Sequence, residues 1–190
     1  DLALNESTPI EITNVLTDFT KPVITINSPK SNSSINSGNI NYFLSEDLNK
    51  GNVIWYPSGT NINASTSQIM SLDAEELNSG DHTQDKMIFP PILENDKRYD
   101  IAFYGKDFAG NFSDTLYVNN VLFDTIIPVI SLDFPYSNNN VNDFTLSYSL
   151  SEPLLEGKII LNRISGNEDL NSPHIVELTQ ERLNKLDNFD

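Results

Sequence analysis

Three carboxylates that lie far apart in the chain, Asp18, Glu46 and Asp107, are the residues best suited to chemistry, and Asn111 follows the last of them. Calcium takes about six to eight oxygen ligands, several of them carboxylates. If the chain folds as two packed antiparallel sheets, Asp18 precedes the first strand, Glu46 follows the second and Asp107 follows the next-to-last. These three positions share one pole of such a fold. The set therefore predicts a calcium site, to which Asn111 adds a carbonyl oxygen.

The same residue types recur 106 residues later as Asp124 and Glu152. We expect them to face residues 94–96, at the opposite pole of the same domain, where a bound cation would stiffen the junction with the next domain. A structural alternative stays open for residues 107–111. Gly110 can adopt a positive φ angle, so this stretch can serve only to close a hairpin.

Other kinds of site find little support in the sequence. The absence of Cys excludes disulfides, thiolate metal sites and thiol nucleophiles. His82 and His174 are expected in polar loops at non-equivalent positions, so nothing pairs an oriented His with a Ser and a carboxylate. The adjacent Glu75 and Glu76 fit solvated positions in a helical turn better than an acid/base pair. No phosphate-loop, dinucleotide or zinc-protease motif is present. We therefore expect a protein that is not an enzyme.

Composition narrows the choice of partners. The 190 residues are 38% hydrophobic, enough to bury a core, and carry 11 Lys and Arg against 27 Asp and Glu, a formal net charge of −16. Such a surface opposes binding to nucleic acid and to anionic membranes. No apolar run approaches the ~18 residues of a membrane span, and no signal-like start is present, so any export signal is expected outside this chain.

The chain repeats itself at an offset of 106 residues without a gap. Between residues 18–84 and 124–190, 22 of the 67 aligned pairs are identical. Residues 1–17 join the same register, because they align with 107–123. A period of this length suits a whole β-sandwich domain of about 100 residues rather than a solenoid coil. We therefore expect three segments: 1–17 as the C-terminal strand of a preceding repeat, 18–123 as a complete repeat, and 124–190 as an incomplete following repeat.

Short strand-like runs separated by turn residues fill the central repeat. We expect seven strands, at residues 22–27, 39–45, 52–56, 68–72, 86–89, 99–104 and 115–122. The one helical signal is a single turn at residues 73–77. Trp55 is expected in the core, where its counterpart Leu161 indicates a need for bulk rather than for an indole. Leu93 and Tyr99 resemble a tyrosine corner, in which the hydroxyl bonds back to the backbone.

Several motifs together resemble bacterial immunoglobulin-like repeats of large extracellular proteins. They are Asp18 with Pro22, Ser45-Glu46-x-Leu48-x-x-Gly51, Leu72 with Leu77, and Tyr99 followed by Asp107-x-Ala109-Gly110-Asn111. Residues 1–5 depart from the pattern by lacking the Gly, and residues 124–190 lack its Tyr and Asp-x-Ala-Gly-Asn part. The resemblance implies an all-β fold of tandem immunoglobulin-like, fibronectin-III-like antiparallel β-sandwiches with about 106 residues per repeat.

The resemblance also implies an extracellular or cell-surface location and a structural or adhesive role. We expect neighbouring repeats of the same chain as partners, with other surface proteins or glycans as further candidates. The Asn-rich loops 32–36 and 138–142 fit turns better than a sugar-binding site. Two alternatives stay open: accessory modules of an extracellular carbohydrate-active enzyme, and a subunit of a self-assembling surface layer or filament.

Overall fold

The computed structural model describes residues 2–83, 90–138, 141, 145–184 and 187–189. It divides into two compact units, Asp1–Thr125 (unit 1) and Ile126–Asp190 (unit 2), and each is described by itself. Within the described ranges, no helix has the length and apolar character needed to cross a bilayer.

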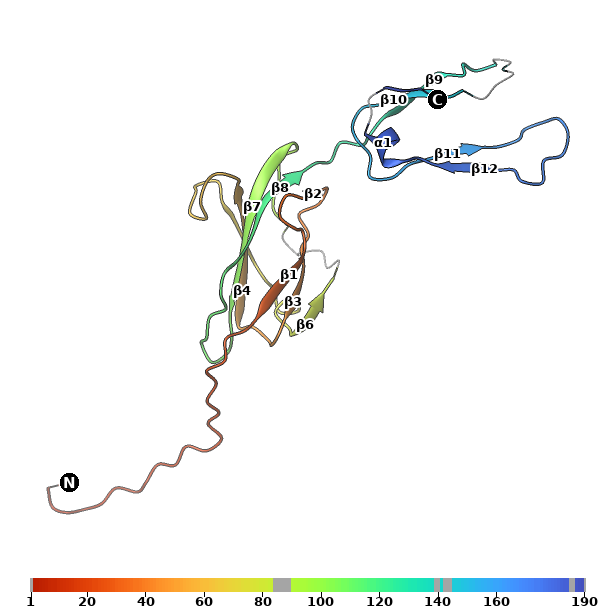
Figure 1. Ribbon diagram of the computed structural model, residues 1–190. Helices are drawn as coiled ribbons and strands as arrows, with labels where there is room; N and C mark the ends of the chain where they lie inside the picture. Colours follow the sequence, from red (N-terminus) through yellow and green to blue (C-terminus); the bar gives the residue numbers. More distant parts are fainter. Residues whose placement is uncertain (1, 84–89, 139–140, 142–144, 185–186, 190) are drawn as a thin grey trace. The chain divides into compact units, whose positions relative to one another are not determined.

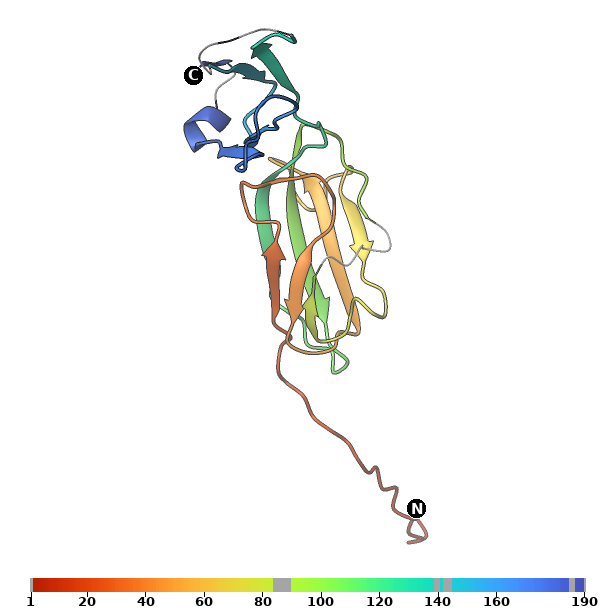
Figure 2. The same cartoon turned by 90° about the vertical axis from the view of Figure 1, so that its right-hand side faces the viewer.

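Unit 1 consists of two sheets that pack face to face (Figures 1 and 2). The larger sheet has five strands in the order β2 (Ser34–Ile35), β8 (Leu116–Phe123), β7 (Lys97–Lys106), β4 (Lys50–Pro57) and β5 (Gln68–Ser71). The smaller sheet has three strands in the order β1 (Ile24–Ser28), β3 (Asn41–Leu44) and β6 (Gly80–His82). The pairings are antiparallel except for the short parallel contact of β2 with β8.

Alternating apolar side chains of both sheets form one core. Trp55 on β4 and Phe103 on β7 are fully buried there, beside Ile24 of the facing sheet. Tyr99 lies edge-on to Trp55, with ring centroids 6.4 Å apart. Its hydroxyl accepts a hydrogen bond of 2.9 Å from the backbone N–H of Glu94. The predicted tyrosine corner is therefore confirmed, and it anchors the loop before β7 to the core.

The single turn predicted at residues 73–77 is present. The Oδ1 atom of Asp73 accepts the N–H groups of Glu75 and Glu76, and Oε2 of Glu76 accepts the N–H of Asp73 in return. This reciprocal arrangement is a capping box. It turns Leu77 toward Gly51, where an added Cβ would lie 2.6 Å from the side chain of Leu72 and 3.4 Å from that of Leu77. Glycine at position 51 thus lets both leucines pack against β4.

Unit 2 has an antiparallel three-stranded sheet and a separate two-stranded ladder. The sheet has the order β13 (Asp187–Phe189), β10 (Ser147–Leu150) and β9 (Ile130–Phe134). The ladder pairs β11 (Lys158–Leu161) with β12 (His174–Glu177), and the short helix α1 (Gln180–Leu183) follows. Leu146, Tyr148 and Leu150 form a small buried cluster.

Hydrogen bonds of unit 1 recur in unit 2 at the 106-residue offset. The hydroxyl of Ser45 accepts the N–H of Val23, as Ser151 does for Val129, both at 2.8 Å. Three further pairs of bonds recur: Leu72 N–H to Gly51 O with Leu178 to Gly157, Leu48 N–H to Leu77 O with Leu154 to Leu183, and Tyr42 hydroxyl to Glu76 O with Tyr148 to Arg182. The sequence repeat therefore reflects a repeated local structure.

The all-β prediction is confirmed, and six of the seven predicted runs coincide with strands. The seventh, residues 86–89, lies outside the described residues. Two short strands were not predicted, β2 and β6, because each has only two or three mostly polar residues.

The placement of His82 in a loop was wrong: it lies buried on β6 and stacks on Tyr42, with ring centroids 4.5 Å apart. His174 lies on β12 rather than in a loop. Residues 1–17 were expected to be the C-terminal strand of a preceding repeat, and their described part, residues 2–17, carries no strand.

Candidate metal centre

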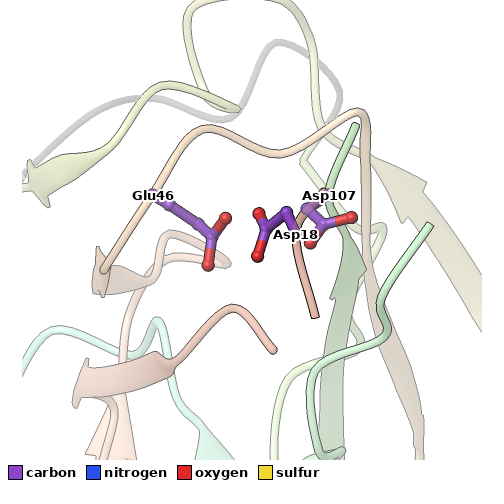
Figure 3. A group of neighbouring side chains, drawn as sticks. All are labelled: Asp18, Glu46 and Asp107. Carbon is purple, nitrogen blue, oxygen red and sulfur yellow. The ribbon is translucent and has the colours of Figure 1, made fainter. Parts of the chain in front are cut away.

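The carboxylates of Asp18, Glu46 and Asp107 gather at one pole of unit 1 (Figure 3). Each comes from a different segment: Asp18 from the chain entering β1, Glu46 from the loop after β3, and Asp107 from the end of β7. One carboxylate oxygen of each lies within 4.8 Å of the others. The sequence thus predicted correctly which three carboxylates the fold brings together, because it predicted the strands that carry them.

Asp107 is the most constrained member of this acidic cluster. It is buried, and its Oδ1 atom accepts the N–H groups of Gly110 at 2.6 Å and Asn111 at 2.8 Å. Burial raises the pKa of Asp107, but hydrogen bonds from Asn111, Gly110 and Ala109 outweigh it, and the net pKa is lowered. Gly110 has a φ of 103°, a conformation that favours glycine. Residues 107–111 therefore form the turn that was expected to close the hairpin. The lowered pKa of Asp107 favours the ionised carboxylate in the cluster.

The ionised form of Glu46 is electrostatically unfavourable at its position in the cluster. Burial raises the pKa of its carboxyl, and repulsion from Asp18 and Asp107 raises it further. Asp18 holds its own position through Oδ1, which accepts the N–H of Thr20 at 2.8 Å. Among the described residues, none of these three carboxylates forms an ion pair with a lysine, arginine or histidine. A cation would therefore relieve the repulsion that is built into this pole.

Asn111 also has a role that was not predicted. Its Nδ2 atom donates to Oδ2 of Asp107 at 2.8 Å and to the backbone oxygen of Asp18 at 3.2 Å. The carbonyl oxygen that we expected it to offer to a cation stays a prediction. In this arrangement Asn111 ties the turn after β7 to the segment entering β1. The sequence gives no signal for this orientation, because an amide has a donor and an acceptor on one side chain.

The second predicted set is divided between the two units. Asp124 lies at the end of unit 1, where its N–H donates to the oxygen of Ile35 at 2.8 Å. Glu152 lies in unit 2, and its Oε1 atom is buried without a hydrogen-bond partner among the described residues. In the loop that they were expected to face, Asn95 accepts both the N–H and the hydroxyl of Thr125. A second cation site at these residues stays a prediction.

Two variants that each replace a carboxylate with a neutral amide, Asp107→Asn and Glu46→Gln, should change the pH dependence of stability in opposite ways when a chelator is present. The lowered pKa of Asp107 means that its ionised form stabilises the fold above about pH 4, its unfolded value, and that this contribution is lost as the pH falls through the folded pKa. The raised pKa of Glu46 means that ionisation of this carboxyl destabilises the fold. The protonated form of Glu46 therefore favours the folded state at low pH, and this contribution is lost as the pH rises through the folded pKa.

We therefore expect Asp107→Asn to melt lower than the parent chain at pH 7 and Glu46→Gln to melt higher, with both differences shrinking toward pH 3. Thermal unfolding followed by circular dichroism between pH 3 and 7 measures this. A lower melting temperature for Glu46→Gln at pH 7 would contradict the assigned repulsion.

No protein-family model, curated protein or solved structure matches the chain. The function is therefore inferred from the sequence and from the geometry of the chain itself.

Proposed function

We propose that the chain is a segment of a tandem array of immunoglobulin-like β-sandwiches in a cell-surface or secreted protein, where it acts as a non-catalytic spacer or adhesion module. One observation carries this proposal: the same hydrogen bonds recur in both units at the 106-residue offset of the sequence repeat. Recurrence of this kind is typical of modules copied in series. Such a series suits a protein whose task is to span distance or present surface.

Each unit has a core cluster of its own, which favours independent modules over one continuous domain. The net charge of −16 gives the modules like-charged surfaces, and repulsion between them would keep an array extended and soluble. The core of unit 1, with Trp55, Phe103 and Ile101 fully buried, supports stability without Cys.

We further propose that the acidic cluster binds calcium. Its position supports a mechanical role, because Asp18 lies where the chain enters the sandwich and Asn111 already ties that point to the turn after β7. A cation held by Asp18, Glu46 and Asp107 would fix the entering segment to two loops of the sandwich. Bound calcium would then set the direction of the preceding segment and stiffen the array.

Location is the most direct test of the array proposal. An antibody raised against residues 18–123 is expected to label intact producing cells, or to detect the protein in the medium, without permeabilisation. A cytoplasmic protein detected in parallel controls for leakage. Signal confined to permeabilised cells would contradict a surface or secreted role, whatever the outcome for calcium.

A further inference from the structure

The outer face of the larger sheet of unit 1, the face turned away from the core, has apolar residues at its centre. Trp55 on β4 belongs to the core, so its neighbours Ile54 and Tyr56 point to the outer face. Both are buried there in a small cluster with Ala102 of β7, and Ile62 from the loop between β4 and β5 packs against this cluster. A sheet face that meets only solvent usually carries polar residues instead.

A pocket of about 230 Å³ lies on the same face, next to this cluster. Tyr104 belongs to both, since it packs against the cluster and lines the pocket. The volume suits one small ring, because pockets for drug-sized molecules usually have about 300–1,000 Å³. The lining comes from β4, β7 and the loop after β7: Lys50, Asn52, Tyr104, Gly105, Lys106 and Phe112. Among these described residues none is acidic, although the chain has 27 Asp and Glu against 11 Lys and Arg.

The two lysines of the pocket, Lys50 and Lys106, are directly opposite each other on β4 and β7. Like charges in opposed positions of an antiparallel pair destabilise the pairing. Within the described part of the chain, neither lysine forms an ion pair with a carboxylate. The Nζ atom of Lys106 lies 5.4 Å from the centroid of the Phe112 ring, and this contact favours its position at the pocket. A negatively charged ligand group would relieve the repulsion between the two lysines.

The other groups of the pocket suit a sugar ring. The Oδ1 atom of Asn52 accepts the hydroxyl of Ser71 at 3.1 Å, and its Nδ2 atom has no partner among the described residues, so it can donate to a ligand hydroxyl. Phe112 is 57% exposed and Tyr104 is partly exposed, so aromatic surface is open to a ligand. The electron-rich faces of aromatic rings attract C–H groups such as those of a pyranose. Together with the lysines, these groups match the carboxylate, hydroxyls and C–H face of an acidic sugar.

The other copies of the repeat do not share these outer-face residues. At the 106-residue offset, three residues of this face correspond to glutamates: Lys50 to Glu156, Phe112 to Glu6 and Tyr117 to Glu11. The hydrogen bonds that recur in unit 2 involve none of these positions, so the repeated local structure does not require a cation or an aromatic ring there. The basic and aromatic character of the face is therefore a property of unit 1 rather than of the repeat.

We propose that this pocket binds one carboxylate-bearing sugar unit of an otherwise neutral glycan. Lys50 and Lys106 pair with the carboxylate, Asn52 donates to a hydroxyl, and Tyr104 and Phe112 contact the C–H face of the ring. The net charge of −16 repels polyanions at longer range, which selects a single charged unit over an acidic polymer. The inference rests on the adhesive role in the proposed function and names a partner for that role.

NMR titration of the 190-residue chain with matched sugars tests the pocket. Methyl glucuronide and methyl glucoside differ at C6, where the first has a carboxylate and the second a hydroxymethyl group. A chelator in all samples prevents a cation from bridging the sugar to the acidic cluster. We expect methyl glucuronide, or the methyl glycoside of N-acetylneuraminate, to shift the amide signals of residues 50–52, 104–106 and 112, and methyl glucoside to bind about tenfold more weakly or worse.

Three results of this titration would overturn the proposal. The first is the absence of shifts at these residues with both carboxylated sugars. The second is equal affinity for acetate, which would show that the lysines bind charge alone. The third is a short acidic peptide that shifts the same amides at lower concentration than either sugar, which would assign the pocket to a protein partner.

The variant Lys50→Glu, which introduces the residue found at the equivalent position of unit 2, tests the role of the lysine pair. It should weaken binding of the carboxylated sugar by about tenfold or more, because it removes one of the two cations that pair with the carboxylate. It should also melt at or above the temperature of the parent chain, because opposite charges then face each other across β4 and β7. Lost binding therefore does not reflect unfolding.

Lys97→Glu is the matched control, since it makes the same change in net charge at the opposite end of β7 from Lys106. It should keep the affinity of the parent chain, and equal weakening by both variants would refute the pocket. The surface-labelling test is independent of these results. A chain that labels intact cells but binds neither carboxylated sugar loses this pocket and keeps the spacer role. A chain that binds methyl glucuronide but is confined to permeabilised cells keeps the pocket and loses the surface role.

Discussion

Replacing Trp55 with alanine is expected to lower the free energy of unfolding of unit 1 by about 3–5 kcal/mol, the usual range for removing a buried aromatic side chain. Trp55 has 0% exposure, lies on β4 and belongs to the core shared by both sheets. The cavity would also remove the edge-on contact with Tyr99, whose hydroxyl holds the loop before β7. A loss of this size is comparable to the whole stability of many domains.

The matched variant Trp55→Leu should cost much less than Trp55→Ala. The Nε1 atom of Trp55 is buried without a hydrogen-bond partner among the described residues, so removing the indole breaks no hydrogen bond. Leu161 occupies the equivalent position on β11. Urea unfolding followed by circular dichroism suits these variants, because Trp55 is the single Trp and its fluorescence is lost. Equal losses in the free energy of unfolding for Trp55→Ala and Trp55→Leu would contradict the inference that this core position requires side-chain volume rather than an indole.

Strand positions were predictable where the side-chain pattern is strong. Tyr99, Ile101 and Phe103 alternate with more polar neighbours on β7, and that alternation reports burial on one face directly. The strand β6 offered no such signal, because Gly80, Asp81 and His82 contain no aliphatic residue. Its formation depends on pairing with β3, and hence on tertiary structure that a local pattern does not contain.

The acidic cluster was predictable from topology, but its internal bonding was not. Once the strands are placed, Asp18, Glu46 and Asp107 must meet at one pole, since each flanks a strand end there. The direction of the Asn111 amide depends on which neighbours compete for its two ends. The raised pKa of Glu46 depends on burial and distance, which require coordinates.

Calcium is expected to change the order of stability among charge variants of unit 1. For the parent chain, calcium at 100 times its dissociation constant adds about 2.7 kcal/mol to the free energy of unfolding. For a domain of about 100 residues, this corresponds to a rise in melting temperature of roughly 10–20 °C. The response arises because the cation interacts with three carboxylates in the folded state that are far apart in the unfolded chain.

The variants Asp18→Asn and Glu46→Gln each remove one ligand charge. With chelator, Glu46→Gln should melt above the parent chain, because the repulsion that raises the pKa of Glu46 is gone. With calcium, it should melt below the parent chain, because it gains little from the ion. Asp18→Asn keeps an oxygen for the N–H of Thr20, but it removes one of the charges that repel Glu46. It should therefore also melt slightly above the parent chain with chelator, and it should gain less from calcium.

Asp81→Asn is the control for net charge, since Asp81 is an exposed residue of unit 1 outside the cluster. It should respond to calcium as the parent chain does. Calorimetric scans in chelator and in calcium give all the melting temperatures in one series. A parent chain with the same midpoint in both conditions would refute calcium binding at this pole. An equal calcium response in Glu46→Gln and Asp81→Asn would place the ion elsewhere, because the geometry makes Glu46 part of the only carboxylate triad detected among the described residues.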